Sequence, residues 1–359
     1  MVIETETANI VNRELENIKL NYEFCNKDLI SVINYNEKDS LDNICAGYLS
    51  SIYWKLYEHY KDESLKKIAE EYLYILDEKT DLNIVSYKHP FLYNNYIKAY
   101  RSNNSLYYKD LLINESDNLL SMFNQQIGLL GILKKEYYQV NISNIMNLEL
   151  LFWAGNETGN ENYNQIANIH ATNIIKEHFR PDYSCFKSVY YNSDGSVKNK
   201  LPYTNNLNDV TWALGQSYGL YGFVTCYRET GNCIFLQQAI RIADFIINNY
   251  IQINHGNTNE TIYNLYNSDS NKDLASAIIS SSLIELSLHV NNDYKVKYLE
   301  AVDIQLKSLN KNNIENTRKK QSQRNGYTYD MIYHQDINEL MTDYYYLETL
   351  IKYKENYKL

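Results

Sequence analysis

A helix–turn–helix pattern that recurs along the chain limits the fold more than any other feature of the sequence. From Leu65 to Leu76 the apolar residues return at i, i+3, i+4, i+7, i+8 and i+11, and a similar stripe runs from Leu236 to Ile247. Such a stripe is typical of a helix that packs on one face. Because a short polar turn and another apolar helix precede each stripe, the repeating unit is a helical hairpin.

Five polar turns indicate five hairpins. They are Lys61–Ser64, Ser102–Ser105, Thr158–Asn160, Thr230–Asn232 and Asn291–Asp293. A sixth hairpin forms if the C-terminal helix, around residues 343–353, packs beside the N-terminal helix around residues 7–18. An array that closes into a ring leaves no apolar end exposed, whereas an open solenoid needs a polar cap at each end. We therefore predict an all-α fold, an (α/α)6 barrel of six hairpins that forms a single domain over residues 1–359.

Turn-forming residues are scarce, which also favours helices. The 359 residues include 3 prolines and 12 glycines, fewer than the turns of a many-stranded protein require. Two connections between hairpins stand out by their length, Phe179–Asn206 and Asn310–His334. Each is either a binding loop at the rim of the barrel or a surface excursion, and the sequence leaves both interpretations open.

Charge and cysteine usage argue against several classes of partner. Lys and Arg number 34 against 44 Asp and Glu, and the net charge of −10 opposes binding to nucleic acid or to an anionic membrane surface. The first residues, Met1–Leu20, lack the uninterrupted apolar stretch of a signal peptide. The five cysteines form no closely spaced metal pair, which suits reduced thiols. We expect a cytoplasmic protein without metal or cofactor, and the sequence does not indicate its oligomeric state.

Several stretches of the chain carry a resemblance to a known family. They are Asn144–Ala154, His178–Asp182, Trp212–Phe223 with Tyr227–Gly231, and Asp343–Glu348. In order and spacing they are similar to the signature stretches of the unsaturated glucuronyl hydrolases, glycoside hydrolase family 88, which are related to the unsaturated rhamnogalacturonyl hydrolases. The resemblance extends from about Gly47 to the C-terminus. It implies an ancestry in carbohydrate processing.

The resemblance also implies a specific reaction. Members of the family remove the 4,5-unsaturated uronic acid that polysaccharide lyases leave at a nonreducing end, by adding water across the vinyl-ether double bond. One aspartate is central, because a carbon of the double bond is protonated and water is delivered by a positioned acid or base. A second aspartate supports the first, and aromatic, His, Gln and Arg side chains hold the uronate.

Residue by residue, this chain departs from the family where that chemistry takes place. The central aspartate of the family directly precedes the Asn144 stretch, and this chain has Ser143 there. The second aspartate corresponds to Tyr87. A hydroxyl group with an unperturbed pKa far above neutral cannot carry out the proton transfer of a carboxyl group. The arginine and the histidine of the family's uronate site correspond to Leu214 and Tyr203.

Three hypotheses about function remain open. In the first, the chain is a hydrolytically silent homologue whose barrel binds an oligosaccharide or another small ligand. The residues that would contact this ligand are Tyr48, Asn144, Asn147, Tyr203, Trp212, Gln216, Tyr218 and His334. In the second, it is an active hydrolase with a relocated acid, Asp209 or else Asp182, although loop aspartates near a helix start are more often caps. In the third, the pocket acts on another substrate through His334, Asp336, Tyr203 or Tyr87.

Other polar residues have both a structural and a functional interpretation. Glu149 lies in an apolar helix, where it is either a functional carboxylate or a partner of Asp343 or Arg228. Isolated histidines such as His170 and His178 are more often core or surface residues than ligands. The basic cluster Arg318–Lys320 is a solvated loop unless it recognises an anionic ligand. Whether the chain is an enzyme is therefore uncertain from its sequence.

Overall fold

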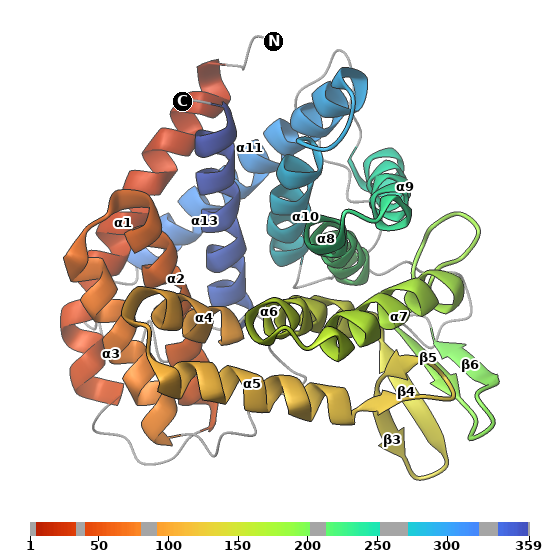
Figure 1. Ribbon diagram of the computed structural model, residues 1–359. Coiled ribbons are helices and arrows are strands. Elements are labelled where there is room, and N and C mark those ends of the chain that lie inside the picture. Colours follow the sequence, from red (N-terminus) through yellow and green to blue (C-terminus); the bar gives the residue numbers. More distant parts are fainter. Residues whose placement is uncertain are drawn as a thin grey trace.

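Helices make up most of the described chain (Figure 1). A computed structural model describes residues 5–33, 40–79, 92–201, 213–251, 272–322 and 337–357. The helices are α1 (Thr5–Ile33), α2 (Ser40–Tyr60), α3 (Glu63–Lys79), α4 (Leu92–Asn103), α5 (Leu106–Ser121), a short 3-10 helix η1 (Ile142–Asn147), α6 (Leu148–Thr158), α7 (Glu161–His178), α8 (Ala213–Thr230), α9 (Cys233–Tyr250), α10 (Lys272–Leu286), α11 (Asn292–Ser322) and α13 (Ile337–Tyr357). Within these ranges, none of the helices has the length and apolar character that crossing a membrane requires.

The polar turns of the sequence join consecutive helices, and two of them share one geometry. Gly159 and Gly231 adopt positive φ angles of 72° and 65°, which glycine does without the steric cost of a Cβ. The next residue, Asn160 or Asn232, caps the second helix by accepting a hydrogen bond from the backbone N–H two residues on, at 3.1 and 3.0 Å. The sequence Thr-Gly-Asn therefore ends one helix and starts the next within three residues.

Alternate helices form an inner and an outer ring. The inner ring consists of α2, α4, α6, α8, α10 and α13, and the other helices lie outside it. α13 packs against α2 and α10, while α1 packs against α13 and α11. The last helix of the chain is therefore adjacent to the first, which closes the ring. The predicted (α/α)6 barrel is confirmed.

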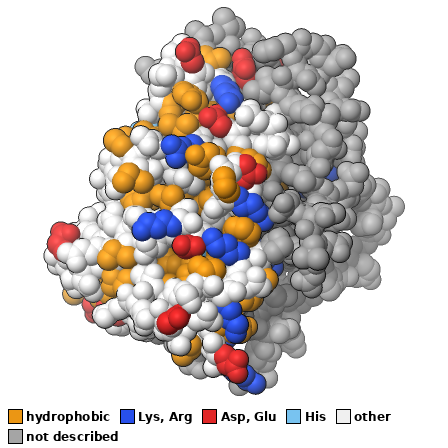
Figure 2. Space-filling view, turned by 90° about the vertical axis from the view of Figure 1, so that its right-hand side faces the viewer, with side chains coloured by type: hydrophobic (Ala, Val, Ile, Leu, Met, Phe, Trp, Pro, Cys, Tyr) orange, Lys and Arg blue, Asp and Glu red, His pale blue; other side chains and the backbone are white. Residues whose placement is uncertain are grey.

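Two small antiparallel sheets correct the expectation of a purely helical chain. β1 (Phe123–Asn124) pairs with β2 (Leu129–Leu130). β3 (Ile132–Lys134), β4 (Tyr137–Asn141), β5 (Ser188–Tyr191) and β6 (Val197–Leu201) form a four-stranded sheet in that order, on the side of the molecule that faces the viewer in Figure 2.

Two of the strands lie in a long connection that the sequence analysis interpreted as a loop. β5 and β6 occupy part of Phe179–Asn206, and α11 extends to Ser322, into the connection Asn310–His334. The sequence pattern does not reveal the strands because they are short. β4 alternates buried and partly buried positions over only five residues, too few to distinguish a strand from the helical periodicity around it.

The connections divide the barrel into two ends. Inner helices lead to outer helices through short turns; α2 ends at Tyr60 and α3 begins at Glu63. Outer helices lead back to inner ones through longer connections, such as residues 122–147 before α6 and 179–212 before α8. Because successive helices alternate in direction, we call the two ends the short-turn end and the long-connection end. The N-terminal halves of the inner helices lie toward the long-connection end.

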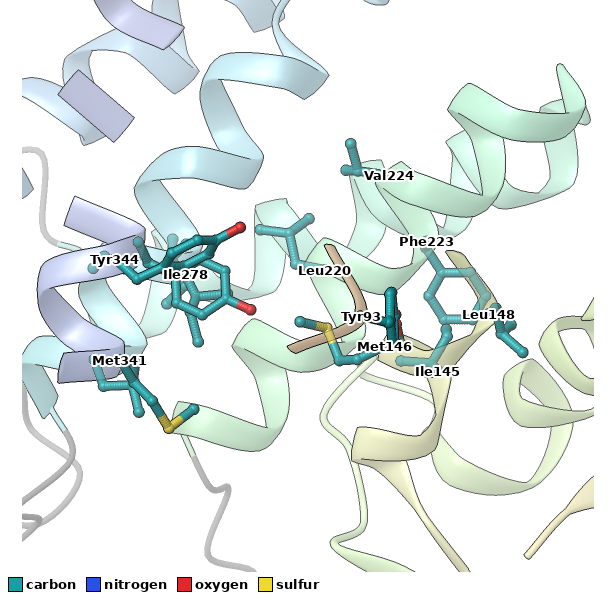
Figure 3. Close-up of a cluster of buried hydrophobic side chains, with 14 of the residues drawn as sticks. Tyr93, Ile145, Met146, Leu148, Leu220, Phe223, Val224, Ile278, Met341 and Tyr344 are labelled. Atoms are coloured by element: carbon teal, nitrogen blue, oxygen red, sulfur yellow. The ribbon is translucent and has the colours of Figure 1, made fainter. Parts of the chain in front are cut away.

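A continuous apolar core joins η1 to the inner ring. Figure 3 shows part of it, with side chains from η1, α8, α10 and α13 that include Met146, Leu220, Ile278, Met341 and Tyr344. Gly222 lets η1 approach α8 closely, because a Cβ at this position would lie 2.4 Å from Cγ2 of Ile145. This contact fixes η1, and with it Ser143, against the inner ring.

Candidate functional site

The described residues hold part of the predicted site. Tyr48, Ser143, Asn144, Asn147, Gln216 and Tyr218 are among them, whereas Tyr87, Tyr203, Asp209, Trp212, His334 and Asp336 lie outside the described residues. The arrangement below therefore rests on η1 and on the inner helices.

The 3-10 helix η1 carries Ser143, Asn144 and Asn147. Ser143 is half-buried, and the two asparagines are buried. In a 3-10 helix, side chains three residues apart share a face, so Ser143 lies one turn from Met146, a core residue labelled in Figure 3. Asn144 donates instead from Nδ2 to the carbonyl oxygen of Leu130 at 3.1 Å. Asn144 thus holds β2, while Ser143 shares the face of η1 that enters the core.

Gln216 and Tyr218 point to different neighbours from α8. Gln216 is fully buried and donates from Nε2 to the carbonyl oxygen of Tyr183 at 3.2 Å. Tyr218 is half-buried and lies near Tyr48 of α2, where burial first and the Tyr218 hydroxyl second raise the pKa of Tyr48. Residues two apart on a helix are separated by about 200°. The structure therefore brings Tyr48 and Tyr218 together and places Gln216 elsewhere.

Tyrosines from three inner helices gather at the level of Tyr48. We call Tyr48, Tyr218, Tyr221, Tyr344 and Tyr345 the tyrosine cluster. The ring centroids of Tyr344 and Tyr345 lie 5.0 Å apart and those of Tyr221 and Tyr345 lie 5.6 Å apart, both edge to face. Burial raises the pKa of every member above its ordinary value. All five hydroxyl groups therefore stay neutral, so each retains both a donor and an acceptor.

Charged side chains from all six inner helices form a network below the tyrosine cluster, toward the short-turn end. We call this set the ion network: Lys55, Glu58, Lys98, Glu149, Arg228, Glu285, Glu348 and Lys352. Arg228 joins three helices, because its guanidinium contacts Glu149 at 2.7 Å and Glu285 at 2.9 Å. Lys98 of α4 pairs with Glu58 of α2. The network therefore ties the inner helices to one another through charge.

Glu348 of α13 has two cationic neighbours in this network, as Glu285 does. It contacts Lys55 at 2.6 Å and Lys352 at 3.2 Å, and it accepts a hydrogen bond from Ser281 at 2.6 Å. Burial alone would raise the pKa of this carboxyl group, but the charges of Lys352 and Lys55 outweigh burial and hold the pKa well below its ordinary range. The same balance lowers the pKa of Glu285 to about 2. Both carboxylates are therefore ionised at neutral pH.

The sequence analysis singled out only one ion pair of this network. The interpretation of Glu149 as the partner of Arg228 is confirmed by their 2.7 Å contact, and the remaining members were missed. A usable signal was present, because Glu348 and Lys352 lie four residues apart within a largely apolar stretch, residues 344–353. A single charge on the apolar face of a helix is costly to bury. Two opposite charges four residues apart on that face therefore indicate that they pair with each other.

Two described aspartates have environments that bear on the search for an acid. Asp182 is exposed and accepts hydrogen bonds from the backbone N–H and the hydroxyl of Ser184, at 3.0 and 2.7 Å. This is the geometry of a turn cap. Asp77, which the sequence analysis did not single out, accepts a hydrogen bond from Tyr96 at 2.9 Å, and burial raises its pKa to about 6. Its place on α3 puts it in the outer ring.

Two buried histidines of α7 hold the strands. Nδ1 of His170 accepts a hydrogen bond from the backbone N–H of Leu130 at 3.0 Å. Nε2 of His178 lies 3.2 Å from the carbonyl oxygen of Val140, so this nitrogen carries the proton. Burial lowers the pKa of His170 to about 3 and that of His178 to about 4. Both rings are neutral, and no group of three or more His, Cys, Asp or Glu residues suited to a metal ion occurs in the described ranges.

Comparison with known proteins gives relatives of one kind. No family model matches the chain. The chain is 29% identical over 276 residues to an unsaturated glucuronyl hydrolase from Formosa agariphila, an alignment that covers 74% of this chain and 67% of the relative. It is 24% identical over 386 aligned positions to an unsaturated chondroitin disaccharide hydrolase from Streptococcus pneumoniae, with 100% and 94% covered.

Solved structures agree with these sequence matches. An unsaturated glucuronyl hydrolase specific for heparin superposes with a TM-score of 0.76 at 25% identity, covering 98% of both chains. A variant unsaturated glucuronyl hydrolase from Streptococcus agalactiae, complexed with dGlcA-GalNAc6S, superposes with a TM-score of 0.59 at 21% identity, covering 86% of this chain and 80% of that one. In sequence and in fold, this chain is therefore similar to the unsaturated glucuronyl hydrolases, at 24–29% identity to the curated relatives.

Proposed function

We propose that the barrel binds a carbohydrate bearing an unsaturated uronic acid, or a closely related anionic sugar, and that the chain does not hydrate the vinyl-ether double bond. The relatives support the ligand class, because their names refer to unsaturated glucuronyl and chondroitin substrates and one solved relative is complexed with dGlcA-GalNAc6S. The observation that carries the second half of the proposal is the protonation state of the barrel's interior.

Hydration of the double bond needs a group that gives up a proton near neutral pH. Among the described residues of the interior, the carboxylates Glu149, Glu285 and Glu348 are engaged with cations. The hydroxyl groups of the tyrosine cluster have raised pKa values, which makes them poorer acids. Ser143, at the position that corresponds to the family's central aspartate, adds only a hydroxyl group. No described group of the interior therefore matches the acid that the reaction requires.

The same interior keeps what binding requires. The tyrosine cluster offers ring faces and neutral hydroxyl groups, and Tyr218 is only half-buried. Nζ of Lys55 lies 4.6 Å from the centroid of the Tyr344 ring, which joins the cluster to the ion network beneath it. A site whose side chains are held in place before the ligand arrives loses less entropy on binding. These features support a binding role for the long-connection end.

The reaction half of the proposal is tested by the ultraviolet absorbance of an unsaturated uronyl disaccharide incubated with three proteins. We expect no loss of vinyl-ether absorbance with the wild type, a measurable loss with Ser143→Asp, and none with Ser143→Asn. The asparagine variant matches aspartate in size but has no acid. Turnover by the wild type would overturn the proposal and favour a relocated acid, and Asp209→Asn would then test that assignment.

The binding half is tested by isothermal titration with the same disaccharide. We expect saturable binding to the wild type and to Ser143→Asn, and equal affinity for Tyr298→Phe, which changes a tyrosine on the outer helix α11, away from the proposed site. Absence of binding to the wild type would overturn this half. If the wild type binds the disaccharide but the Ser143→Asp variant shows no turnover, the pocket holds the sugar in a position where one restored carboxyl group cannot protonate the double bond.

A further inference from the structure

The four-stranded sheet has one buried face and one outward face. Tyr138, Val140, Val189 and Tyr191 are buried against the helices. Directly opposed residues of an antiparallel pair share a face, so the pairs Lys134–Tyr137, Gln139–Tyr190 and Tyr190–Asn199 place these side chains together on the other side. We call Lys134, Tyr137, Gln139, Tyr190, Lys198 and Asn199 the outward sheet face.

Two tyrosines form the centre of this face. The ring centroids of Tyr137 and Tyr190 lie 4.7 Å apart with an interplanar angle of 32°, and both residues are partly exposed. Nζ of Lys198 lies 5.2 Å from the centroid of the Tyr137 ring. Such a pair of tilted rings presents an apolar surface with a polar rim, which matches the alternating C–H and hydroxyl surface of a sugar ring.

Ordered polar groups border the two rings. Gln139 donates from Nε2 to Oδ1 of Asn141 at 2.9 Å, and the same oxygen accepts a hydrogen bond from Ser188 at 2.6 Å. The first bond lies within β4, and the second crosses from β5 to β4. They hold the amides in place beside Tyr190, where they act as a fixed polar edge rather than as mobile surface side chains.

The charge of this segment is opposite to that of the whole chain. The two hairpins, residues 132–141 and 187–201, contain five lysines, one glutamate and one aspartate, while the chain as a whole carries a net −10. Lys134 and Lys198 are exposed at the border of the two rings. Basic and hydrophobic side chains adjoin one another on this side of the molecule in Figure 2. An anionic ligand is therefore drawn to this face in preference to the rest of the surface.

The sheet is continuous with the long-connection end of the barrel. β4 ends at Asn141 and η1, which carries Ser143, begins at Ile142. β6 ends at Leu201, before the connection that leads to α8. A chain of sugars that occupies the barrel from this end would extend past the strands that form the outward sheet face.

We propose that the outward sheet face is a second binding site for an anionic oligosaccharide, in which the rings of Tyr137 and Tyr190 stack on the sugar while Lys134 and Lys198 contact its carboxylate or sulfate groups. This inference rests on the proposed function for the class of ligand. The barrel would hold the terminal sugars, and the sheet would hold the following part of the same chain.

The test compares a short and a long ligand by isothermal titration at low salt. The short ligand is an unsaturated chondroitin disaccharide, and the long ligands are chondroitin decasaccharides with and without sulfate. We expect the Lys134→Gln/Lys198→Gln variant to bind the decasaccharides at least tenfold more weakly than the wild type, with unchanged affinity for the disaccharide. Lys66→Gln/Lys67→Gln on α3 removes the same charge elsewhere and should leave both affinities unchanged.

A second variant separates stacking from charge. Tyr137→Ser/Tyr190→Ser should weaken decasaccharide binding while its far-ultraviolet circular dichroism matches that of the wild type. A larger effect of the lysine substitutions on the sulfated decasaccharide would assign the lysines to sulfate, and equal effects would assign them to carboxylate. Equal affinity of wild type and both variants for the decasaccharides would overturn the inference.

The outcomes distinguish this inference from the proposed function. If the disaccharide binds and the decasaccharides gain nothing from the sheet, the barrel site stands and the sheet site is rejected. If the disaccharide fails to bind while the decasaccharides bind in a manner that depends on Lys134 and Lys198, the sheet site stands and the barrel proposal is rejected.

Discussion

The two ends of the barrel differ in how they treat polar side chains. Toward the short-turn end, the buried carboxylates Glu285 and Glu348 are matched by Arg228, Lys352 and Lys55 within the protein. Toward the long-connection end, the tyrosine cluster and the asparagines of η1 supply neutral hydroxyl and amide groups. Charges removed from water are tolerated only when they are paired, so the first arrangement is complete by itself. The second keeps neutral groups that can exchange water for the hydroxyl groups of a ligand.

This difference separates stability from recognition. Substitutions in the ion network should change the free energy of unfolding and leave ligand contacts alone, because its carboxylates are already paired with cations of the protein. Substitutions in the tyrosine cluster should lower the affinity for the ligand and leave the free energy of unfolding nearly unchanged. The predictions below test that separation, beginning with the largest change in stability.

Removal of the Glu348 carboxylate should produce the largest loss of stability. In Glu348→Gln the ammonium groups of Lys55 and Lys352 lose a shared anion, and a buried pair broken from one side costs roughly 3–5 kcal/mol in the free energy of unfolding. Urea denaturation followed by circular dichroism measures this. Glu355→Gln on the same helix is the control, since Glu355 is exposed and its 3.9 Å contact with His59 is worth less than about 1 kcal/mol. Equal losses in the two variants would contradict the comparison.

Acidification should weaken the two ends in different pH windows. The pKa values of His170 and His178 fall from 6.5 in the unfolded chain to about 3 and about 4 in the folded protein. The unfolded state therefore binds more protons below pH 6.5, and stability decreases as the pH falls from 6.5 toward 4. Between pH 6.5 and 5 this amounts to about 1–2 kcal/mol for each histidine.

The ion network responds at lower pH. The pKa of Glu285 is about 2 in the folded protein against 4.5 unfolded, so its contribution is present above pH 4.5 and is lost as the pH falls toward 2. Urea denaturation at pH 7.5, 6 and 5 measures the histidine window above that of Glu285; Asp77, whose pKa burial raises to about 6, contributes there in the opposite sense. The His178→Gln variant should show about half of the wild-type pH dependence there; an unchanged dependence would assign the effect to other groups.

Shortening the cation that joins three inner helices should have an intermediate effect. Arg228 reaches Glu149, Glu229 and Glu285 with separate nitrogens, a geometry that a single ammonium group cannot reproduce. Arg228→Lys should lower the free energy of unfolding by about 1–2 kcal/mol. Arg101→Lys, at an exposed position near the end of α4, should be neutral in the same thermal or urea unfolding experiment. A neutral Arg228→Lys variant would show that only charge, and not the fork of the guanidinium, is needed.

The smallest change in stability is expected in the tyrosine cluster. Tyr218→Phe removes one half-buried hydroxyl group and should change the free energy of unfolding by less than about 1 kcal/mol. Its affinity for the unsaturated disaccharide should nevertheless fall about tenfold, the equivalent of about 1.4 kcal/mol. Isothermal titration and urea denaturation on the same protein measure both quantities. A variant that loses stability but keeps its affinity would remove Tyr218 from the proposed site.

Much of the fold could be predicted because its information is local. The spacing of apolar residues from Leu65 to Leu76 predicts the buried face of one helix. The Thr-Gly-Asn turns at Gly159 and Gly231 predict where two helices end. The same turn chemistry places the helix caps. The four-stranded sheet escaped prediction because its strands are only three to five residues long. In addition, β4 pairs with β5 across 47 positions, as between Asn141 and Ser188. Pairing at that separation leaves little trace in a short window.

The candidate site was less accessible to sequence reasoning. The pairing of Glu149 with Arg228 agrees with one interpretation drawn from the sequence. The proximity of Tyr48 and Tyr218 was not predicted and comes from the structure. The separation of Gln216 from Tyr218 does not follow from their closeness in sequence, because a helix turns neighbouring residues to different faces. The low pKa of Glu348 depends on Lys55 of α2 and Lys352 of α13, and α2 and α13 are adjacent only because the ring is closed.

The sequence by itself determined the helical hairpins with their turns, the closure expected of six hairpins, and the family resemblance. Each of these depends on residue types at short, regular spacing. Only the tertiary structure decided which charges neutralise one another, which tyrosines share the interior, and which face of the sheet carries exposed lysines beside stacked rings. Those properties depend on distances between residues far apart in the chain, and the energies of ion pairing and burial are set by such distances.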